Sequence, residues 1–577
     1  VAVTAQLQLA VRTPGGLSLD GAMPFEVETL ADGFATPLFH LDGRSGLAWW
    51  GGSLGLDRAP GVEWGNGVAQ LASSAAPAGP EVALPLTLTT LGAQLAGNLA
   101  GRRFVVRAWW PWPSAPPLGL TRAQPWPHLD AQGSALVFGS RHLAVRLSLL
   151  ALTDADIYDD ADGGGPGGAD HALSQDRAST RAVLAEDYQR GPWTATFAQS
   201  VLFDADRTDR GLVQHHHDTR TSFGVRNQLR RTLREVGGLA RLEVEVGAEA
   251  NVTRHALSIA DAADPHEDVA TTGVVASDDV SHRFDGTIWT RDLGAWSSAT
   301  AHLAADVRAT TGLRVDAFGT DIAVQPRGAL ELDLAERLVG TLDAGAYRRA
   351  PEHGDELEHP DLHPERTTRI ALGVQRIADL RGSGGFGGLE VYYLDRTNLV
   401  EDDGTGRLAN TGRGTTYGVR GIAGVHADHW VAVAVVVLEH SDREATPRMR
   451  TRPFEYDQPV RFDARVTRFL GAWQVGAHFE LRAGLPYTRV AGALYDADRD
   501  VYRPSFGALY AERLPWQHQL DLRVDRALGT HLHAYLDLAN VYDRRAAIGW
   551  DYNFNFTQRR AVAAPGILPT LGIRGEL

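Results

Sequence analysis

The C-terminal stretch from Pro515 to Leu577 contains segments in which apolar and charged residues alternate with a period of two, and this feature constrains the fold most. Within residues 519–526, Leu520, Leu522 and Val524 are separated by charged residues. Successive side chains of a strand point to opposite faces, so this strand has one apolar face and one charged face. A soluble sandwich hides its apolar face from water, whereas an outer-membrane barrel turns that face to lipid and keeps a polar lumen. We therefore expect strands at 519–526, 532–538 and the C-terminus, with a long loop before the last one.

Length and composition favour a large barrel over the other classes of protein. The chain has 577 residues and no run of 18 apolar residues, so no transmembrane helix is predicted. The apolar run Trp430–Leu438 has instead the length of a spanning strand, which is about 9–11 residues. The absence of cysteine excludes disulfides and thiolate metal sites, and the net charge of −15 argues against nucleic acid as a partner.

The predicted connections alternate between short and long along the C-terminal half. The segments 527–531, 469–473 and 426–429 are short, whereas 486–517 and 440–459 are long. Bacterial barrels have short periplasmic turns and longer extracellular loops, so one orientation accounts for all of these connections. We predict an all-β fold in which residues 1–577 form one transmembrane antiparallel β-barrel of about 22 strands.

Six short motifs resemble, in order, those of the barrel domain of TonB-dependent outer-membrane receptors. They cover roughly residues 326–577, and each alone is weak. They include an L-x-P-E-x-[ST] segment, an R-x-G-x-P-Y-T segment and an N-[LV]-[FY]-[DN] segment. The motifs are Gly345–Pro351, Leu362–Gly373, Tyr392–Val400, Asn410–Gly421, Arg482–Val490 and Leu536–Asp543.

The resemblance implies a plug domain that fills the lumen and a partner, TonB, that drives its movement. Two departures from the family pattern stand out. Such barrels usually end on an aromatic residue, whereas this chain ends on Leu577. The segment Val1–Thr13 already has the pattern of a strand, so no plug domain is detected before the barrel. The plug is then cleaved, a separate chain, or dispensable.

The candidate ligand site is the run His215, His216, His217 and Asp218. One interpretation is a metal or haem contact on an outer loop. Adjacent side chains of an extended segment point in opposite directions, so three neighbours rarely bind one ion together. A solvated polar loop is therefore favoured at about three to one.

Two other clusters are weaker candidates for ligand binding. The acidic residues between Asp154 and Asp162 offer oxygen ligands for Ca²⁺, but their spacing does not match an EF-hand, and a solvated loop is favoured. Six tryptophans could stack on a sugar, but an interfacial aromatic girdle is favoured. They are Trp49, Trp50, Trp109, Trp110, Trp112 and Trp126.

No catalytic motif is found, so we expect neither an enzyme nor a cofactor, and we predict no metal site. The first functional hypothesis is uptake of a scarce ligand, such as a metal chelate or siderophore, across the outer membrane of a Gram-negative bacterium. Expected partners are outer-membrane lipid, TonB and a separate plug chain, but not nucleic acid. The alternative is an outer-membrane anchor that holds other outer-membrane or periplasmic proteins in an assembly. A passive porin is weaker, because an empty lumen of about 22 strands would compromise the membrane.

Overall fold

The computed structural model consists of strands joined by turns and loops. It describes residues 3–12, 18–27, 61–67, 90–99, 102–111, 120–125, 128–160, 173–210, 214–262, 280–319, 321–351, 361–376, 384–402, 408–427, 429–445, 451–497, 501–530, 532–553, 555–563 and 566–576. Within these ranges every regular element is a strand. No helix in the described part of the chain has the length and apolarity needed to cross a membrane.

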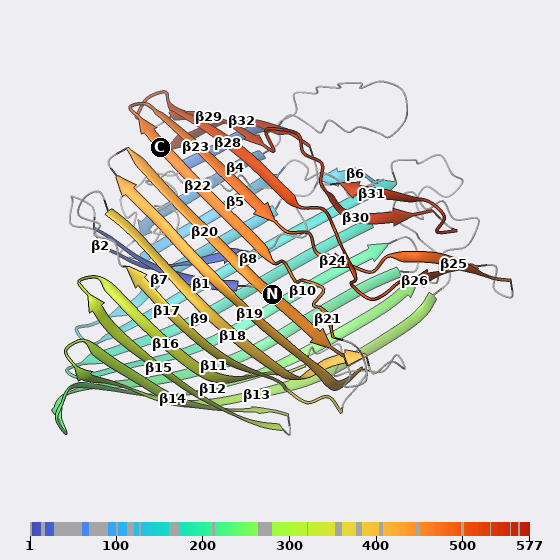
Figure 1. The fold of residues 1–577 in the computed structure, drawn as a ribbon. Coiled ribbons are helices and arrows are strands. Elements are labelled where there is room, and N and C mark those ends of the chain that lie inside the picture. The colour runs from blue at the N-terminus through green and yellow to red at the C-terminus, as the bar shows by residue number, and fades with distance from the viewer. Residues whose placement is uncertain are drawn as a thin grey trace.

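Strand pairing closes the main sheet into an antiparallel barrel, as predicted (Figure 1). Neighbours in the ring are mostly consecutive in sequence, which is the up-and-down topology of outer-membrane barrels. The prediction of about 22 strands concerns the whole chain and stays a prediction. The ring runs through β3 (Gly61–Gly67), β4 (Thr90–Leu99), β5 (Arg102–Pro111), β7 (His128–Gly139), β8 (Leu143–Asp160), β9 (Leu173–Arg190), β10 (Trp193–Arg210), β11 (Gln214–Val236), β12 (Leu239–Ala262), β13 (Val280–Ala304), β14 (Val307–Phe318), β15 (Asp321–Ala335), β16 (Leu338–Arg349), β17 (Glu365–Arg376), β18 (Gly384–Asp402), β19 (Leu408–Ala427), β20 (Trp430–Glu444), β22 (Val460–Leu470), β23 (Trp473–Arg482), β28 (Gln517–Ala527), β29 (Leu532–Ala539) and β32 (Leu568–Glu576).

The two ends of the barrel carry different connections, as the sequence predicted. At one end, strands are joined by tight turns, such as the one between Val236 and Leu239. At the other end, the chain makes excursions such as the one from Arg482 to Gln517. These excursions contain short strands of their own, which the sequence did not indicate, and Figure 1 shows most of them gathered at the right-hand end. They are β6 (Leu120–Pro125), β21 (Arg452–Pro453), β24 (Pro486–Tyr487), β25 (Val490–Asp496), β26 (Val501–Phe506), β27 (Glu512–Arg513), β30 (Ala547–Tyr552) and β31 (Arg559–Ala563).

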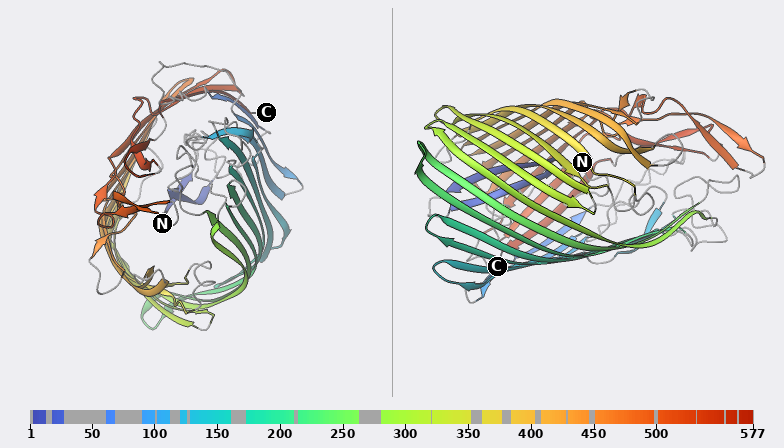
Figure 2. Two further views of the ribbon diagram at one scale, coloured as in Figure 1. Left: turned by 90° about the vertical axis from the view of Figure 1, so that its right-hand side faces the viewer. Right: turned by 90° about the horizontal axis from the view of Figure 1, so that it is seen from below.

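The N-terminal segment is a strand, as predicted, but it is not part of the wall. β1 (Val3–Arg12) pairs only with β2 (Ser18–Val27), in a two-stranded sheet of its own. In the end-on view of Figure 2 this hairpin lies inside the outline of the ring. The extent of the barrel domain over residues 1–577, without a plug, stays a prediction.

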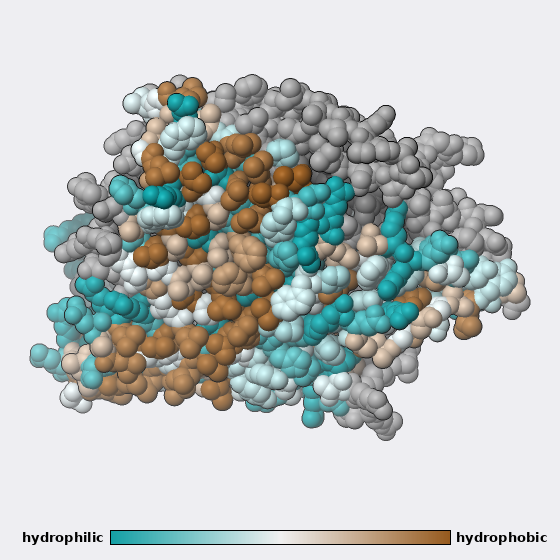
Figure 3. Space-filling model, turned by 45° about the horizontal axis from the view of Figure 1, so that its top comes forward, coloured by the Kyte–Doolittle hydropathy of each residue, from teal (hydrophilic) through white to brown (hydrophobic). Residues whose placement is uncertain are grey.

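The wall has an apolar outer face and a polar inner face. In β17, Ile370 and Leu372 are 52% and 61% exposed, whereas Ala371 between them is 2% exposed. In β28, Arg523 and Asp525 are buried on the inner face, which places Leu522 on the outer face, as predicted. Figure 3 shows the apolar side chains gathered over the middle of the wall, with hydrophilic ones toward the loop-bearing end. This apolar band is the surface that faces lipid.

Several local predictions can be compared with the observed strands. Trp430–Leu438 lies within β20, as expected. The acidic residues from Asp154 to Asp160 belong to β8, so the prediction of a loop there is wrong. Pairing with β9 as far as Tyr158, and with β6 as far as Asp160, continues the strand past its apolar part. Trp109 and Trp110 lie at the end of β5. Asp162 and the remaining four tryptophans of the girdle hypothesis lie outside the described residues.

Candidate functional site

Ion pairs between neighbouring strands line the inner face of the barrel. On β28 and β29, Arg523 donates to Asp525 at 2.6 Å and to Asp537 at 3.0 Å. The Arg523 guanidinium also lies 4.3 Å from the centre of the Tyr535 ring. Each charge is thereby compensated where water is partly excluded, which is the condition for burying an ion at low cost.

A dense group of titratable side chains surrounds His478 on β23, which is 1% exposed. Its Nε2 lies 2.6 Å from Asp463 Oδ2 on β22 and 3.4 Å from Glu480 Oε1 on β23. Its Nδ1 lies 3.6 Å from Asp521 Oδ2 on β28. The imidazole is therefore surrounded by three carboxylates that come from three adjacent strands.

A second inner group joins β18, β20 and β22. Tyr392 donates its hydroxyl hydrogen to Glu439 at 2.5 Å, and Arg461 donates to the same carboxylate at 3.4 Å. The Tyr392 hydroxyl also lies over Gly418 on β19, where a Cβ would come within 2.8 Å of it. Two of the predicted motifs, those containing Tyr392 and Gly418, thus meet on adjacent strands.

Asn410 connects its own motif with the motifs that contain His363 and Asn398. Its amide donates to the carbonyl oxygens of His363 and Asn398, at 2.8 and 2.9 Å, and its Oδ1 accepts the His363 backbone N–H at 2.7 Å. Glu365 accepts the backbone N–H of Val400 at 3.1 Å. These bonds hold the segment that leads into β17 against the ends of β18 and β19 at the loop-bearing side of the barrel.

The R-x-G-x-P-Y-T motif provides a close backbone contact at the start of the long excursion after β23. A Cβ at Gly484 would overlap the carbonyl group of Leu514, so only glycine allows this approach. Beside it, the fully buried carboxylate of Asp457 accepts hydrogen bonds from Arg513 and from the Ser441 backbone N–H. The excursion is thus anchored to the wall at its base.

The N-[LV]-[FY]-[DN] motif forms the corresponding anchor after β29. Asn540 has a φ of 51°, a left-handed conformation that asparagine tolerates. Its Nδ2 donates to the Arg544 carbonyl at 2.9 Å, and its Oδ1 accepts the Arg544 N–H at 3.0 Å. Its backbone N–H donates to Asp521 at 2.7 Å. The asparagine therefore closes the turn and also fixes a carboxylate next to His478.

At the loop-bearing end of the barrel, a polar cluster joins β18, β21 and the excursion that follows β23. Tyr510 donates to Glu455 at 2.8 Å, and burial together with this carboxylate raises the pKa of Tyr510 to about 12. The Arg452 guanidinium lies 5.0 Å from the Tyr510 ring centre and pairs with Glu401 at 2.9 Å. The Tyr510 hydroxyl thus remains a hydrogen-bond donor to a higher pH than that of an unperturbed tyrosine.

The predicted His215–Asp218 site lies in strand β11 rather than in a loop. His217 Nε2 lies 2.7 Å from Asp209, and the His215 and His217 rings are 5.0 Å apart. His216 is exposed, and Asp218 points with it to the opposite face, where it pairs with Arg220 at 3.4 Å. The structure therefore does not bring the four residues together, because adjacent side chains of a strand diverge. Whether any of them contacts a ligand stays a prediction.

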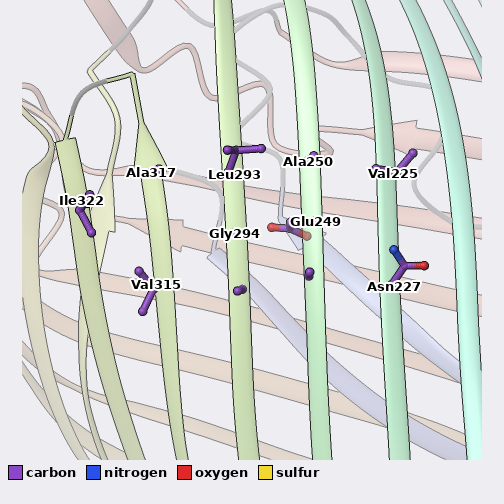
Figure 4. A pocket seen from close by; sticks show the side chains of 11 residues that line it. Val225, Asn227, Glu249, Ala250, Leu293, Gly294, Val315, Ala317 and Ile322 are labelled. Carbon is purple, nitrogen blue, oxygen red and sulfur yellow. The ribbon is translucent and has the colours of Figure 1, made fainter.

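A shallow hollow on the outer wall has the character of a lipid-facing surface. It measures about 480 Å³ and is lined mainly by small and aliphatic side chains. They come from strands β11 to β15, and Figure 4 shows Val225 on one side of the hollow and Ile322 on the other. Most of its lining side chains are apolar, although Glu249, which pairs with Arg226 at 3.1 Å, also borders it, so we assign the hollow to the wall rather than to the His478 group.

The sequence patterns did not indicate the His478 group. Asp463, His478 and Glu480 lie on the consecutive strands β22 and β23, but Asp521 comes from β28, beyond a long excursion, and alternating charged residues are expected of any polar lumen. The available signal was His478 and Glu480 at a spacing of two on one predicted strand, since such residues share a face.

The chain was compared with known proteins by sequence and by structure. The family model described as "TonB dependent receptor-like, beta-barrel" matches residues 116–557. The comparison with curated protein sequences gives no match.

Solved structures share the fold at low sequence identity. FpvA of P. aeruginosa, solved bound to heterologous pyoverdines, aligns with a TM-score of 0.64 and 11% identity, over 90% of this chain and 72% of that one. The siderophore receptor PirA of Acinetobacter baumannii aligns with a TM-score of 0.63 and 11% identity, over 90% and 81%. The outer membrane transporter YddB of Escherichia coli aligns with a TM-score of 0.61 and 12% identity, over 90% and 81%.

Proposed function

We propose that this chain, which belongs to the family of TonB-dependent receptor β-barrels, takes up a metal chelate of the siderophore class across the bacterial outer membrane. The single observation that carries the proposal is the family match over residues 116–557. Outer-membrane ligand uptake is the function of that family, and the chelate is the finer step. It is supported by the siderophore receptors among the structures of the same fold.

The fold is suited to this task. The apolar outer band holds the barrel in lipid, and the polar inner wall surrounds a wet passage. The anchored excursions, including the one based at Gly484 and Asp457, place long segments at one mouth of the barrel. In the proposed mechanism these segments bind the chelate, and TonB then drives movement of a plug that gates the lumen.

The proposal is tested in two steps. First, the protein is extracted gently from its native outer membrane, and mass spectrometry identifies its N-terminus, every bound chain and any bound chelate. A plug, within the chain or as a separate small chain, is expected. Second, cells with and without TonB are given ⁵⁵Fe-labelled chelates, and TonB-dependent accumulation is expected.

The anchor hypothesis predicts the opposite pattern. Extraction would then bring along unrelated outer-membrane or periplasmic proteins, with no plug. Accumulation of ⁵⁵Fe would not depend on this chain. That combination would overturn the uptake proposal.

A further inference from the structure

We propose that His478, Asp463 and Glu480 form a binding site for a divalent transition-metal ion of the Zn²⁺ class in the inner wall of the barrel. The inference goes beyond the proposed function, because metal binding by the isolated barrel is measurable whatever ligand the receptor takes up. It rests on the positions of three ligand atoms on adjacent strands.

The three ligand atoms are brought together by strand register. Asp463 on β22 is directly opposite Glu480 on β23, and His478 shares the inner face with Glu480 two residues away. Asp463 Oδ2, His478 Nε2 and a Glu480 oxygen all lie within 4.8 Å of one another. Of the residues that the structure describes, this is the group of three or more His, Asp and Glu side chains with such geometry.

The distances are close to those of a metal site. Zn²⁺ bonds to nitrogen and oxygen are about 2.0–2.2 Å long, so the ligand atoms of a tetrahedral site lie roughly 3.3 Å apart. His478 Nε2 and Glu480 Oε1 are already 3.4 Å apart. His478 Nε2 and Asp463 Oδ2, at 2.6 Å, have the separation of a hydrogen bond. Replacing the bridging proton by a metal ion therefore requires this pair to open by roughly 0.7 Å, which rotation of a carboxylate provides.

The other ring nitrogen of His478, Nδ1, faces a carboxylate, as in many zinc sites. Asp521 Oδ2 lies 3.6 Å from His478 Nδ1, and Asp521 is itself held by Gln519 and by the Asn540 backbone N–H, each at 2.7 Å. A carboxylate behind a ligating histidine fixes the ring and raises its basicity. The conformation of Asn540 thus helps to hold the metal-binding histidine through Asp521.

Two arginines lie close to the site but do not occupy the ligand positions. Arg465 pairs with Asp463 Oδ1 at 3.3 Å, and Arg482 pairs with Glu480 Oε2 at 2.9 Å. In each carboxylate the arginine takes one oxygen, and the other oxygen faces His478. The arginines therefore orient the carboxylates and compensate their charge.

The geometry leaves one coordination position open. Asp463 and Glu480 are partly exposed on the inner side of the wall, whereas His478 is buried. Three protein ligands and an open fourth position are typical of zinc sites that exchange a ligand, whereas structural sites are closed. Nitrogen and carboxylate ligands favour Zn²⁺, Co²⁺ or Ni²⁺ over Ca²⁺ and Mg²⁺.

The test is titration of the purified full chain in detergent with Co²⁺, followed by displacement with Zn²⁺. We expect each chain to bind one Co²⁺. The bound ion should show the visible absorption of a tetrahedral or five-coordinate Co²⁺. His478→Gln is expected to weaken binding more than 100-fold, and Asp521→Asn about 10–100-fold. Heat-shifted electrophoretic mobility verifies that each variant is folded.

The matched control is His217→Gln, because His217 also pairs with a carboxylate, at 2.7 Å from Asp209, and lies near a second histidine ring. It is expected to leave the Co²⁺ signal unchanged. If the Co²⁺ signal is lost in His217→Gln and retained in His478→Gln, the inference is overturned. If His478→Gln does not fold, zinc-edge X-ray absorption of the wild-type chain replaces it. One imidazole with oxygen ligands is then expected, and a spectrum without imidazole or with several would contradict the site.

Discussion

At the scale of single residues, the two faces of the wall impose opposite requirements on side chains. Leu522 lies on the outer face and Arg523 on the inner face of β28, although they are adjacent. Arg523 is tolerated because two carboxylates and an aromatic ring surround it. The same charge on the outer face would have only lipid as its surroundings.

We therefore expect Leu522→Arg to destabilise the barrel by about 2–4 kcal/mol, because it places a cation in the bilayer near mid-depth. Heat-induced unfolding in lipid vesicles measures the change. Leu528→Arg is the control, since Leu528 lies just beyond the end of β28 and is 52% exposed, and its cost should be about 0–1 kcal/mol. Equal costs at the two positions would contradict the assigned membrane face.

A second prediction concerns the buried carboxylate of Asp457. Arg513→Ala removes the arginine that pairs with this carboxylate, leaves the longer contact with His440 Nδ1 at 3.7 Å, and should cost about 1–3 kcal/mol, less than for a fully buried pair because Arg513 is 33% exposed. Adding Asp457→Asn should recover part of the loss, because it removes the buried negative charge that has lost its arginine. Urea unfolding of both single variants and the double variant measures the coupling.

The control for that cycle is Arg489→Ala. Arg489 pairs with Glu512 at 3.5 Å on an exposed surface, so its removal should cost less than about 1 kcal/mol. Additive effects of Arg513→Ala and Asp457→Asn would show that the buried pair is not coupled.

At the scale of elements, the strands are longer than a bilayer requires. β11, β12 and β13 have 23, 24 and 25 residues, whereas about 9–11 residues span the membrane. The extra length extends the wall beyond the lipid. The excursions start from these extended strand ends, and hydrogen bonds and close contacts at their bases hold them to the wall. Gly484, with its close approach to Leu514, is such an anchor.

Gly484→Ala should detach the excursion between β23 and β28 from the wall, because the added Cβ overlaps the Leu514 carbonyl. We expect a loss of more than about 1 kcal/mol in stability and faster proteolysis between residues 488 and 511. Gly492→Ala is the matched control, since nothing lies within 4 Å of a Cβ there. Equal proteolysis of the two variants would argue against an anchoring role for Gly484.

At the scale of the whole molecule, the barrel depends on one long-range pairing. β3, near the N-terminus, pairs with β32 at the C-terminus, with Val62 opposite Gly575. Without this seam the sheet would have two exposed edges. The ring is therefore completed only when both ends of the chain are in place.

The seam can be tested with engineered cysteines, because the chain has none of its own. Opposite residues of an antiparallel pair have Cα atoms about 4.5–5.5 Å apart, which suits a disulfide. We expect Val62→Cys with Gly575→Cys to cross-link on oxidation, as measured by thiol labelling and mass spectrometry. Val62→Cys with Arg574→Cys should not, because a shift of one residue points the thiols to opposite faces. Equal cross-linking of both pairs would contradict this register.

The all-β class of fold, the unequal connections at the two ends of the barrel and the family follow from local sequence patterns. These patterns are the two-residue period, the alternation of connection lengths and the six motifs, whereas the orientation in the membrane stays a prediction. Which charges meet depended on the tertiary structure. Asp463 and His478 lie on β22 and β23, which a tight turn joins, whereas Asp521 lies on β28, beyond the long excursion after β23, so its proximity to His478 depends on long-range strand pairing and register, which no local pattern specifies. For the same reason the separate pairing of β1 with β2 was decided by strand pairing, whereas the divergence of His216 from His215 and His217 follows from the two-residue period of any extended segment.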